Sequence, residues 1–123
     1  MVTNINKTTT VKGLSGKEYK FKLYTFDTFS DVQTNLWLSE PALYLFTHRE
    51  YSNGAYYHTY LYLGETGDLS QRFANHHKEE ELKQRQTNCI GIYLDVPQNE
   101  ADRKQVEKDI LSAYKFPCNE QYQ

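Results

Sequence analysis

The order of strand-like and helix-like segments constrains the fold of this chain more than any other feature. Five short segments have the apolar or alternating patterns that are typical of β-strands, and four of them come before the first helical pattern. These segments are residues 9–12, 17–25, 42–47, 57–64 and 89–96, and helices are predicted over residues 68–77 and 100–115. Consecutive strands with few helices favour an α+β fold, in which a small, mainly antiparallel sheet is flanked by helices. The last three strand segments are expected to form the core of the sheet, and the first two an N-terminal hairpin.

Turn residues separate these segments. Residues 13–16 read Gly-Leu-Ser-Gly and are expected to form the turn of the N-terminal hairpin, with glycine where φ is positive. Residues 52–54, Ser-Asn-Gly, mark a turn between the third and fourth strand segments. Residues 28–38 form either a short helix or a loop, and residues 79–86 either a loop or an exposed helical turn.

The chain of 123 residues is short enough for a single folded domain. We expect residues 1–8 to be disordered and residues 9–40 to form a β extension and linker. Residues 41–123 are expected to form the main domain.

Composition and charge exclude several classes of protein. No apolar run approaches the roughly 20 residues that span a bilayer, and residues 1–10 lack the apolar segment of a secretory signal peptide. Two cysteines, Cys89 and Cys118, are too few for a disulfide scaffold or an all-cysteine zinc site. A cytoplasmic protein without membrane contact is therefore expected. The formal net charge is −2, so binding to nucleic acid depends on a local basic patch or on a partner.

The predicted helix over residues 100–115 carries a carboxylate on its apolar face. At about 100° per residue, Val106, Ile110 and Leu111 define one arc, and Glu107 falls within it. A carboxylate among apolar side chains is costly unless it is paired, hydrogen-bonded or bound to a metal. Glu107 therefore either forms an ion pair with Arg103, four residues earlier, or has a functional role.

Two further pairs of residues allow both a structural and a functional interpretation. Arg72 and His76 are four residues apart, which places them on one flank of the predicted helix over residues 68–77. They belong either to a solvated basic helix or to a phosphate clamp, since arginine presents a planar fork of donors and histidine transfers protons near neutral pH. Tyr44 and Tyr62 lie in strand segments and serve either packing or proton transfer.

Taken together, these residues resemble the GIY-YIG nuclease superfamily. Its pattern is a strand with a tyrosine, then a strand ending in tyrosine, an aliphatic residue and glycine, then an arginine and a later glutamate. The resemblance covers about residues 41–119, so residues 41–123 are expected to form a GIY-YIG nuclease-like domain. The matching residues are Ala42-Leu43-Tyr44, Tyr62-Leu63-Gly64, Arg72, His76, Glu107 and Asn119.

The chain departs from the family pattern in mild ways. Ala42 and Leu43 stand where the pattern has glycine and isoleucine, and Leu63 replaces an isoleucine. A literal Gly-Ile-Tyr occurs at residues 91–93, but no Tyr-aliphatic-Gly element follows it. We interpret residues 91–93 as part of the third core strand.

The resemblance implies a metal-dependent DNA endonuclease that hydrolyses phosphodiester bonds with a single metal ion. Glu107 would bind Mg²⁺, for which Mn²⁺ could substitute, and Arg72 would hold a phosphate oxygen. Tyr44 would activate the water, directly or through a neighbour, if a nearby cation lowers its pKa. Tyr62 and His76 would orient the water or shuttle the proton. Asn119 would fix Glu107 or the local loop by hydrogen bonds.

The implied partner is DNA, either branched or nicked, with a protein partner as a second means of targeting. Two other functions remain open, because a fold does not determine a function. One is a catalytically inactive nucleic-acid-binding module. The other is a protein-interaction module that uses the N-terminal hairpin as its contact surface.

Overall fold

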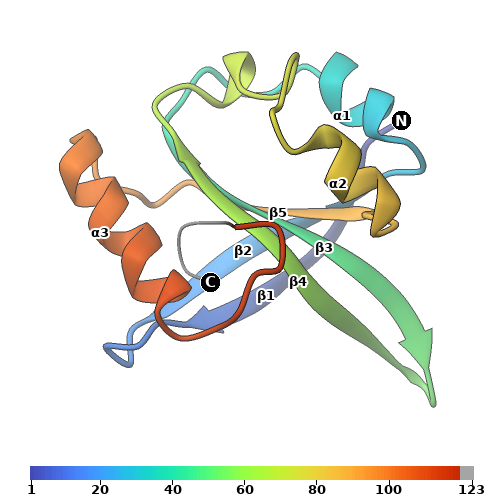
Figure 1. Cartoon of the computed structure of the whole chain (residues 1–123), viewed down its shortest axis with the longest axis horizontal. Coiled ribbons are helices and arrows are strands. Elements are labelled where there is room, and N and C mark those ends of the chain that lie inside the picture. The colour runs from blue at the N-terminus through green and yellow to red at the C-terminus, as the bar shows by residue number, and fades with distance from the viewer. Residues whose placement is uncertain (120–123) are drawn as a thin grey trace.

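The computed structural model describes residues 1–119, and the chain is built on one five-stranded sheet (Figure 1). In chain order its elements are β1 (Thr3–Lys12), β2 (Glu18–Thr25), α1 (Phe29–Thr34), β3 (Ala42–Ser52), β4 (Ala55–Thr66), the 3-10 turn η1 (Leu69–Gln71), α2 (Glu79–Gln84), β5 (Cys89–Tyr93) and α3 (Glu100–Leu111). The strands lie in the order β1-β2-β5-β3-β4, and every neighbouring pair is antiparallel. The structure thus confirms the α+β class and the antiparallel sheet.

The sheet buries apolar side chains on both faces. Tyr44, Phe46 and Ile90 belong to a cluster that α1, η1 and α2 cover, and Leu45 and Leu63 belong to a second cluster on the face that α3 covers. Figure 1 shows α3 well apart from α1 and α2, with the sheet between them. Strands buried on both faces account for the nearly continuous apolar sequences of β3 and β5. Residues 91–93 lie in β5, as expected for a core strand.

A two-residue turn extends the hairpin of β3 and β4 beyond its predicted limits. Asn53 and Gly54 have positive φ values of 51° and 84°, the conformation of a tight hairpin turn. Pairing between β3 and β4 therefore continues to Ser52 and Ala55, well past residues 47 and 57. In the N-terminal hairpin, Gly16 has the expected positive φ, at 92°.

The start of the chain is ordered, contrary to the prediction for residues 1–8. β1 begins at Thr3, and Thr3 and Asn4 pair with the far end of β2. An irregularity between Asn4 and Thr8, with Asn6 at positive φ, interrupts this pairing. The polar sequence hid the strand because most of its side chains face solvent.

The predicted helix over residues 68–77 is wrong. Only Leu69–Gln71 forms a 3-10 turn, which the Asp68 side chain caps through the Ser70 backbone N–H. Conversely, Glu79–Gln84 forms a helix with a buried Leu82 and a 2.7 Å ion pair between Lys83 and Glu79. The open alternative at residues 28–38 resolves into α1 followed by a loop. β5 and α3 end at Tyr93 and Leu111, before the predicted residues 96 and 115.

No helix within residues 1–119 combines the length and the apolar character that crossing a membrane requires. Cys89 and Cys118 are both buried free thiols.

The N-terminal hairpin is fastened to α3 through one carboxylate. Asp109 accepts hydrogen bonds from the Ser15 backbone N–H (2.8 Å), the Ser15 hydroxyl (2.7 Å) and the Tyr19 hydroxyl (2.8 Å). A side chain on Gly13 would overlap the Asp109 carboxylate, so glycine lets the turn approach the helix closely. We call this set of contacts the Asp109 anchor.

Asp109→Ala is expected to lower the free energy of unfolding by about 1 to 2 kcal/mol, because the Tyr19 and Ser15 donors lose their acceptor. Asp109→Asn should lose less, since its amide oxygen still accepts. Urea denaturation measures both, with Asp27→Asn as an exposed control. Equal urea midpoints for Asp109→Ala and Asp27→Asn would show that the anchor contributes nothing.

Candidate functional site

The hydroxyl of Tyr44 is the centre of a buried polar cluster. Tyr44 lies in β3 and is fully buried. Its hydroxyl oxygen accepts a hydrogen bond from Arg72 Nε at 2.8 Å and lies 3.0 Å from His76 Nε2. Gly64 pairs with Tyr44 across the sheet, and a side chain at Gly64 would overlap the Tyr44 ring. The glycine of the Tyr62-Leu63-Gly64 motif thus makes room for the tyrosine.

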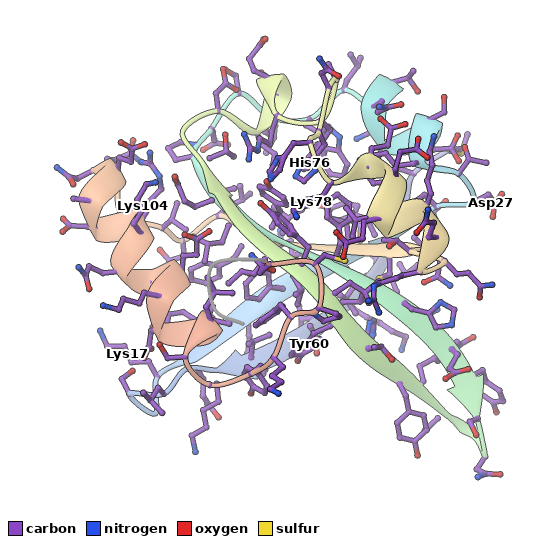
Figure 2. All side chains as sticks on the ribbon, in the orientation of Figure 1. Lys17, Asp27, Tyr60, His76, Lys78 and Lys104 are labelled. Atoms are coloured by element: carbon purple, nitrogen blue, oxygen red, sulfur yellow. The ribbon has the colours of Figure 1, made fainter. Side chains whose placement is uncertain are left out.

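The tautomer of His76 follows from its second hydrogen bond. The Lys78 backbone N–H donates to His76 Nδ1 at 3.1 Å, so the proton of the neutral ring is on Nε2. His76 therefore donates to the Tyr44 hydroxyl and does not accept from it. Figure 2 labels His76 and Lys78 close together, between β4 and α2.

Tyr62 completes the cluster on the side nearest the surface. Its ring lies 6.0 Å from that of Tyr44 and edge-on to that of His76, with centroids 5.1 Å apart. The Tyr44 hydroxyl accepts from both Arg72 and His76, so it donates its own proton toward Tyr62. His77 stacks on His76 at 5.0 Å and meets the edge of Tyr62. The four residues Tyr44, Tyr62, Arg72 and His76 are thus brought together.

Burial controls the protonation of this cluster. Burial and the neighbouring Tyr62 raise the pKa of Tyr44, and the opposing effect of the Arg72 guanidinium does not offset them. Burial also raises the pKa of Tyr62. Burial and the positive charge of Arg72 lower the pKa of His76 to about 4. At neutral pH the cluster therefore contains two phenols, a neutral imidazole and one guanidinium.

Glu107 lies in α3, which covers the other face of the sheet. The side chain is half-buried. Burial and the nearby Glu65 carboxylate raise its pKa to about 7, against the opposing effects of Lys104 and Arg72. Its charge also raises the pKa of Tyr62, which links it to the tyrosine cluster. Glu107 and the cluster thus share one electrostatic environment at β4, an edge strand.

The alternative of an ion pair between Glu107 and Arg103 is wrong. Arg103 is buried and donates from Nε to Glu65 at 3.1 Å, and Lys104 lies 3.9 Å from the other oxygen of Glu65. Within residues 1–119, no hydrogen bond or ion pair engages the Glu107 carboxylate. Among the described residues, the carboxylate on the apolar arc of α3 therefore has only the more distant charges of Lys104 and Arg72 to offset its burial.

Glu65 is the site residue that the sequence analysis missed. It directly follows Gly64, and strand alternation turns it away from Tyr44 and toward α3. Its side chain is only 10% exposed. A buried acid next to the tyrosine motif, with Arg103 available on the opposing helix, was the signal in the sequence.

Asn119 binds the backbone of β4. Its Oδ1 accepts from the Leu63 N–H at 2.9 Å, and its Nδ2 donates to the Leu63 carbonyl at 2.8 Å. The Cys118 N–H adds a bond to the Leu61 carbonyl. Asn119 thus fixes the strand between Tyr62 and Gly64, and these contacts involve no atom of Glu107.

The residues of the site fit a divalent cation that keeps most of its water ligands. No three His, Cys, Asp or Glu side chains within residues 1–119 are grouped to hold a metal ion. One or two carboxylates with water suffice for Mg²⁺. Glu107 has the unsatisfied carboxylate that such a cation would relieve, and Glu65, held by Arg103, adds negative charge beside it.

The buried neutral His76 predicts a loss of stability in acid. The unfolded chain takes up this proton near pH 6.5 and the folded chain only near pH 4, so His76 lowers stability as the pH drops through this range, while Glu107, with its pKa raised to about 7, acts in the opposite direction. The expected contribution of His76 is about 2 to 3 kcal/mol. It is measured by urea denaturation as the change, between pH 7 and pH 4, in the difference in unfolding free energy between the wild type and His76→Gln, which keeps a donor toward Tyr44. Parallel curves for the two proteins would contradict the prediction.

Comparisons with protein-family models, with curated proteins and with solved structures each find no match to this chain.

Proposed function

We propose that this protein is a metal-dependent DNA endonuclease that hydrolyses phosphodiester bonds by a GIY-YIG-type mechanism. The observation that carries the proposal is the Tyr44–Arg72–His76 hydrogen-bond cluster together with the Glu107 carboxylate, which has no hydrogen-bond or ion-pair partner among residues 1–119 and interacts electrostatically with Arg72. Four of the six residues expected from the resemblance, from β3, β4 and the segment at and after η1, come together there, and Glu107 acts on them electrostatically from α3. The sixth, Asn119, holds the strand that bears Tyr62.

Arg72 is suited to holding the phosphate. Its Nε is engaged by Tyr44, which fixes the plane of the guanidinium. The terminal nitrogens approach Tyr62 and present the fork of donors that phosphate oxygens bind. A fixed guanidinium stabilises the negative charge that builds on phosphorus-bound oxygens as water attacks.

The burial of Tyr44 favours proton transfer from the attacking water through a neighbouring residue over transfer directly to the Tyr44 hydroxyl. The Tyr44 side chain is fully buried, so a water molecule does not reach its hydroxyl directly. Tyr62 is 7% exposed and lies in the direction in which Tyr44 donates. His76 carries its proton on Nε2 and accepts at Nδ1, so its role in this scheme is to orient Tyr44.

Glu107 is the proposed ligand of Mg²⁺, for which Mn²⁺ could substitute. A bound divalent cation supplies charge neutralisation at the scissile phosphate and at the leaving oxygen. Glu107 would hold it from α3, with Glu65 as the nearest additional carboxylate. The Asp109 anchor and the Arg103–Glu65 ion pair fasten α3 on either side of Glu107 and so fix its position relative to Arg72.

The first test is cleavage of supercoiled and branched DNA with Mg²⁺, with Mn²⁺ and with EDTA. Cleavage is expected with either metal and not with EDTA. Glu107→Ala should lower the rate by at least about 100-fold and leave DNA binding intact. Glu100→Gln, in the exposed first turn of the same helix, is the matched control.

Two outcomes would contradict the proposal. One is a folded wild-type protein that cleaves no DNA substrate with either metal. The other is cleavage by Glu107→Ala at the wild-type rate.

Glu107→Gln is expected to raise stability and abolish cleavage. Above pH 7 the folded protein must hold an ionised Glu107 that prefers its proton, so the neutral amide should stabilise the fold at pH 8. The gain is about 1 to 2 kcal/mol, since the side chain is only half-buried. Below about pH 4.5 the difference should vanish. Thermal denaturation at pH 8 should also show that Mg²⁺ stabilises the wild type and not the variant. Equal stabilisation of both proteins by Mg²⁺ would place the metal elsewhere.

A further inference from the structure

An aromatic groove of about 620 Å³ follows the outer half of β4. Tyr56, Tyr57 and Tyr60 of β4 line it, together with Tyr114 and Lys115 from the segment after α3. The hairpin of β3 and β4 projects beyond the rest of the sheet (Figure 1), and Tyr60 lies beside the loop that follows α3 (Figure 2). We call this feature the tyrosine groove.

The groove has a fixed inner part and an exposed outer part. Tyr60 packs against Tyr114 with ring centroids 5.3 Å apart and stacks on Phe116 at an interplanar angle of 14°. The Tyr114 hydroxyl accepts from the Lys12 N–H at 3.3 Å. Tyr56 and Tyr57, by contrast, are 52% and 57% exposed. The Tyr57 ring, and the part of the Tyr56 ring that Arg49 and Tyr51 do not cover, are apolar surfaces open to solvent.

None of the residues that line the groove within 1–119 is acidic, and Lys115 is the cation among them, although the chain as a whole carries a formal net charge of −2. Burial lowers the pKa of His58, and the exposed Glu50 pairs with Tyr57 across the hairpin. The Arg49 guanidinium lies 3.5 Å from the centre of the Tyr56 ring, on the same hairpin. Exposed aromatic rings flanked by cations suit a ligand with flat π-faces and negative charge.

We propose that the tyrosine groove binds the single-stranded part of a nucleic acid, which wraps the β4 edge with one base stacked on Tyr56, another on Tyr57 of the opposite face, and a phosphate near Lys115. Unpaired bases expose the faces that stack on aromatic side chains, whereas a duplex keeps those faces inside its own stack. The positive or titratable groups near the groove, Arg49, His58 and Lys115, supply only part of the affinity. Stacking supplies the remainder, so we expect the affinity to depend only weakly on salt concentration.

The groove leads toward the candidate site along one strand. Tyr60 and Tyr62 both lie on β4, but a ladder irregularity between them turns Tyr60 toward the α3 face and Tyr62 toward the tyrosine cluster. A single strand held in the groove would thus approach the site from the α3 face, which carries Glu107. This link rests on the proposed nuclease function and would make the substrate DNA with an unpaired segment, such as a branch or flap.

The test is fluorescence anisotropy with a fluorescein-labelled 12-nucleotide oligothymidylate and a duplex of equal length. The wild-type protein is used in EDTA, so that no cleavage occurs. The oligothymidylate should bind more tightly than the duplex. Tyr56→Ala and Tyr57→Ala should each weaken its binding by about 5- to 150-fold.

Matched variants separate stacking from loss of structure. Tyr56→Phe and Tyr57→Phe keep the ring and should bind within about twofold of the wild type. Lys115→Ala should reduce the slope of log affinity against log salt by about 0.7. Lys20→Ala, which removes an exposed cation from a different hollow, should change neither affinity nor slope. Unchanged urea midpoints establish that the alanine variants fold.

The proposal is overturned if the wild type does not bind the oligothymidylate, or if both tyrosine-to-alanine variants bind it as the wild type does. Failure of the nuclease function is distinguishable from failure of the groove. Tyrosine-dependent binding without cleavage in Mg²⁺ would support the groove and remove the nuclease. Cleavage in Mg²⁺ together with oligothymidylate binding that Tyr56→Ala and Tyr57→Ala leave unchanged would support the nuclease and remove the groove. Capture of a protein at this surface, without oligonucleotide binding, would also overturn the proposal.

Discussion

The burial of one phenol hydroxyl organises the rest of the site. Tyr44 lies in a central strand, and its polar oxygen would be costly there without hydrogen bonds. Arg72 and His76 satisfy it, and this requirement draws the chain after η1 inward. Gly64 on the neighbouring strand leaves the space that the Tyr44 ring needs. The packing around β3 and the proposed chemistry of the site therefore both depend on the Tyr44 hydroxyl oxygen.

The strands could be predicted from the sequence because their patterns are local. Alternation in β2 and the apolar run of β5 identified both strands. The helix expected over residues 68–77 failed because two side chains at helical spacing instead converge on Tyr44 from a non-helical loop. A tertiary hydrogen bond outweighed the local pattern, and no window of sequence contains that information. β1 failed for a related reason, since it is defined by pairing with β2 and its side chains are mostly exposed.

The candidate site could be assembled from sequence only in part. The resemblance to the GIY-YIG nucleases selected Tyr44, Tyr62, Arg72, His76, Glu107 and Asn119 as site residues. It could not tell whether Arg103 pairs with Glu107 or with another acid, because the answer depends on where α3 crosses β4. In the structure Arg103 forms an ion pair with Glu65, so the Glu107 carboxylate has no hydrogen-bond or ion-pair partner in the described chain. Asn119, in turn, acts on the strand through the backbone of Leu63.

The Asp109 anchor joins the N-terminal hairpin to the main domain. Residues 9–40 were expected to be an extension outside the main domain, yet Ser15 and Tyr19 hold the helix that carries Glu107. β2 also pairs with β5, which lies between it and β3. Segments 90 or more residues apart must therefore meet before the carboxylate is in place. The polar residues of the tyrosine cluster lie within residues 44 to 78, but the burial of Tyr44 also needs β5, which pairs with β3. Translation in order therefore supplies the tyrosine cluster and its covering strand before Glu107, which comes last, from α3.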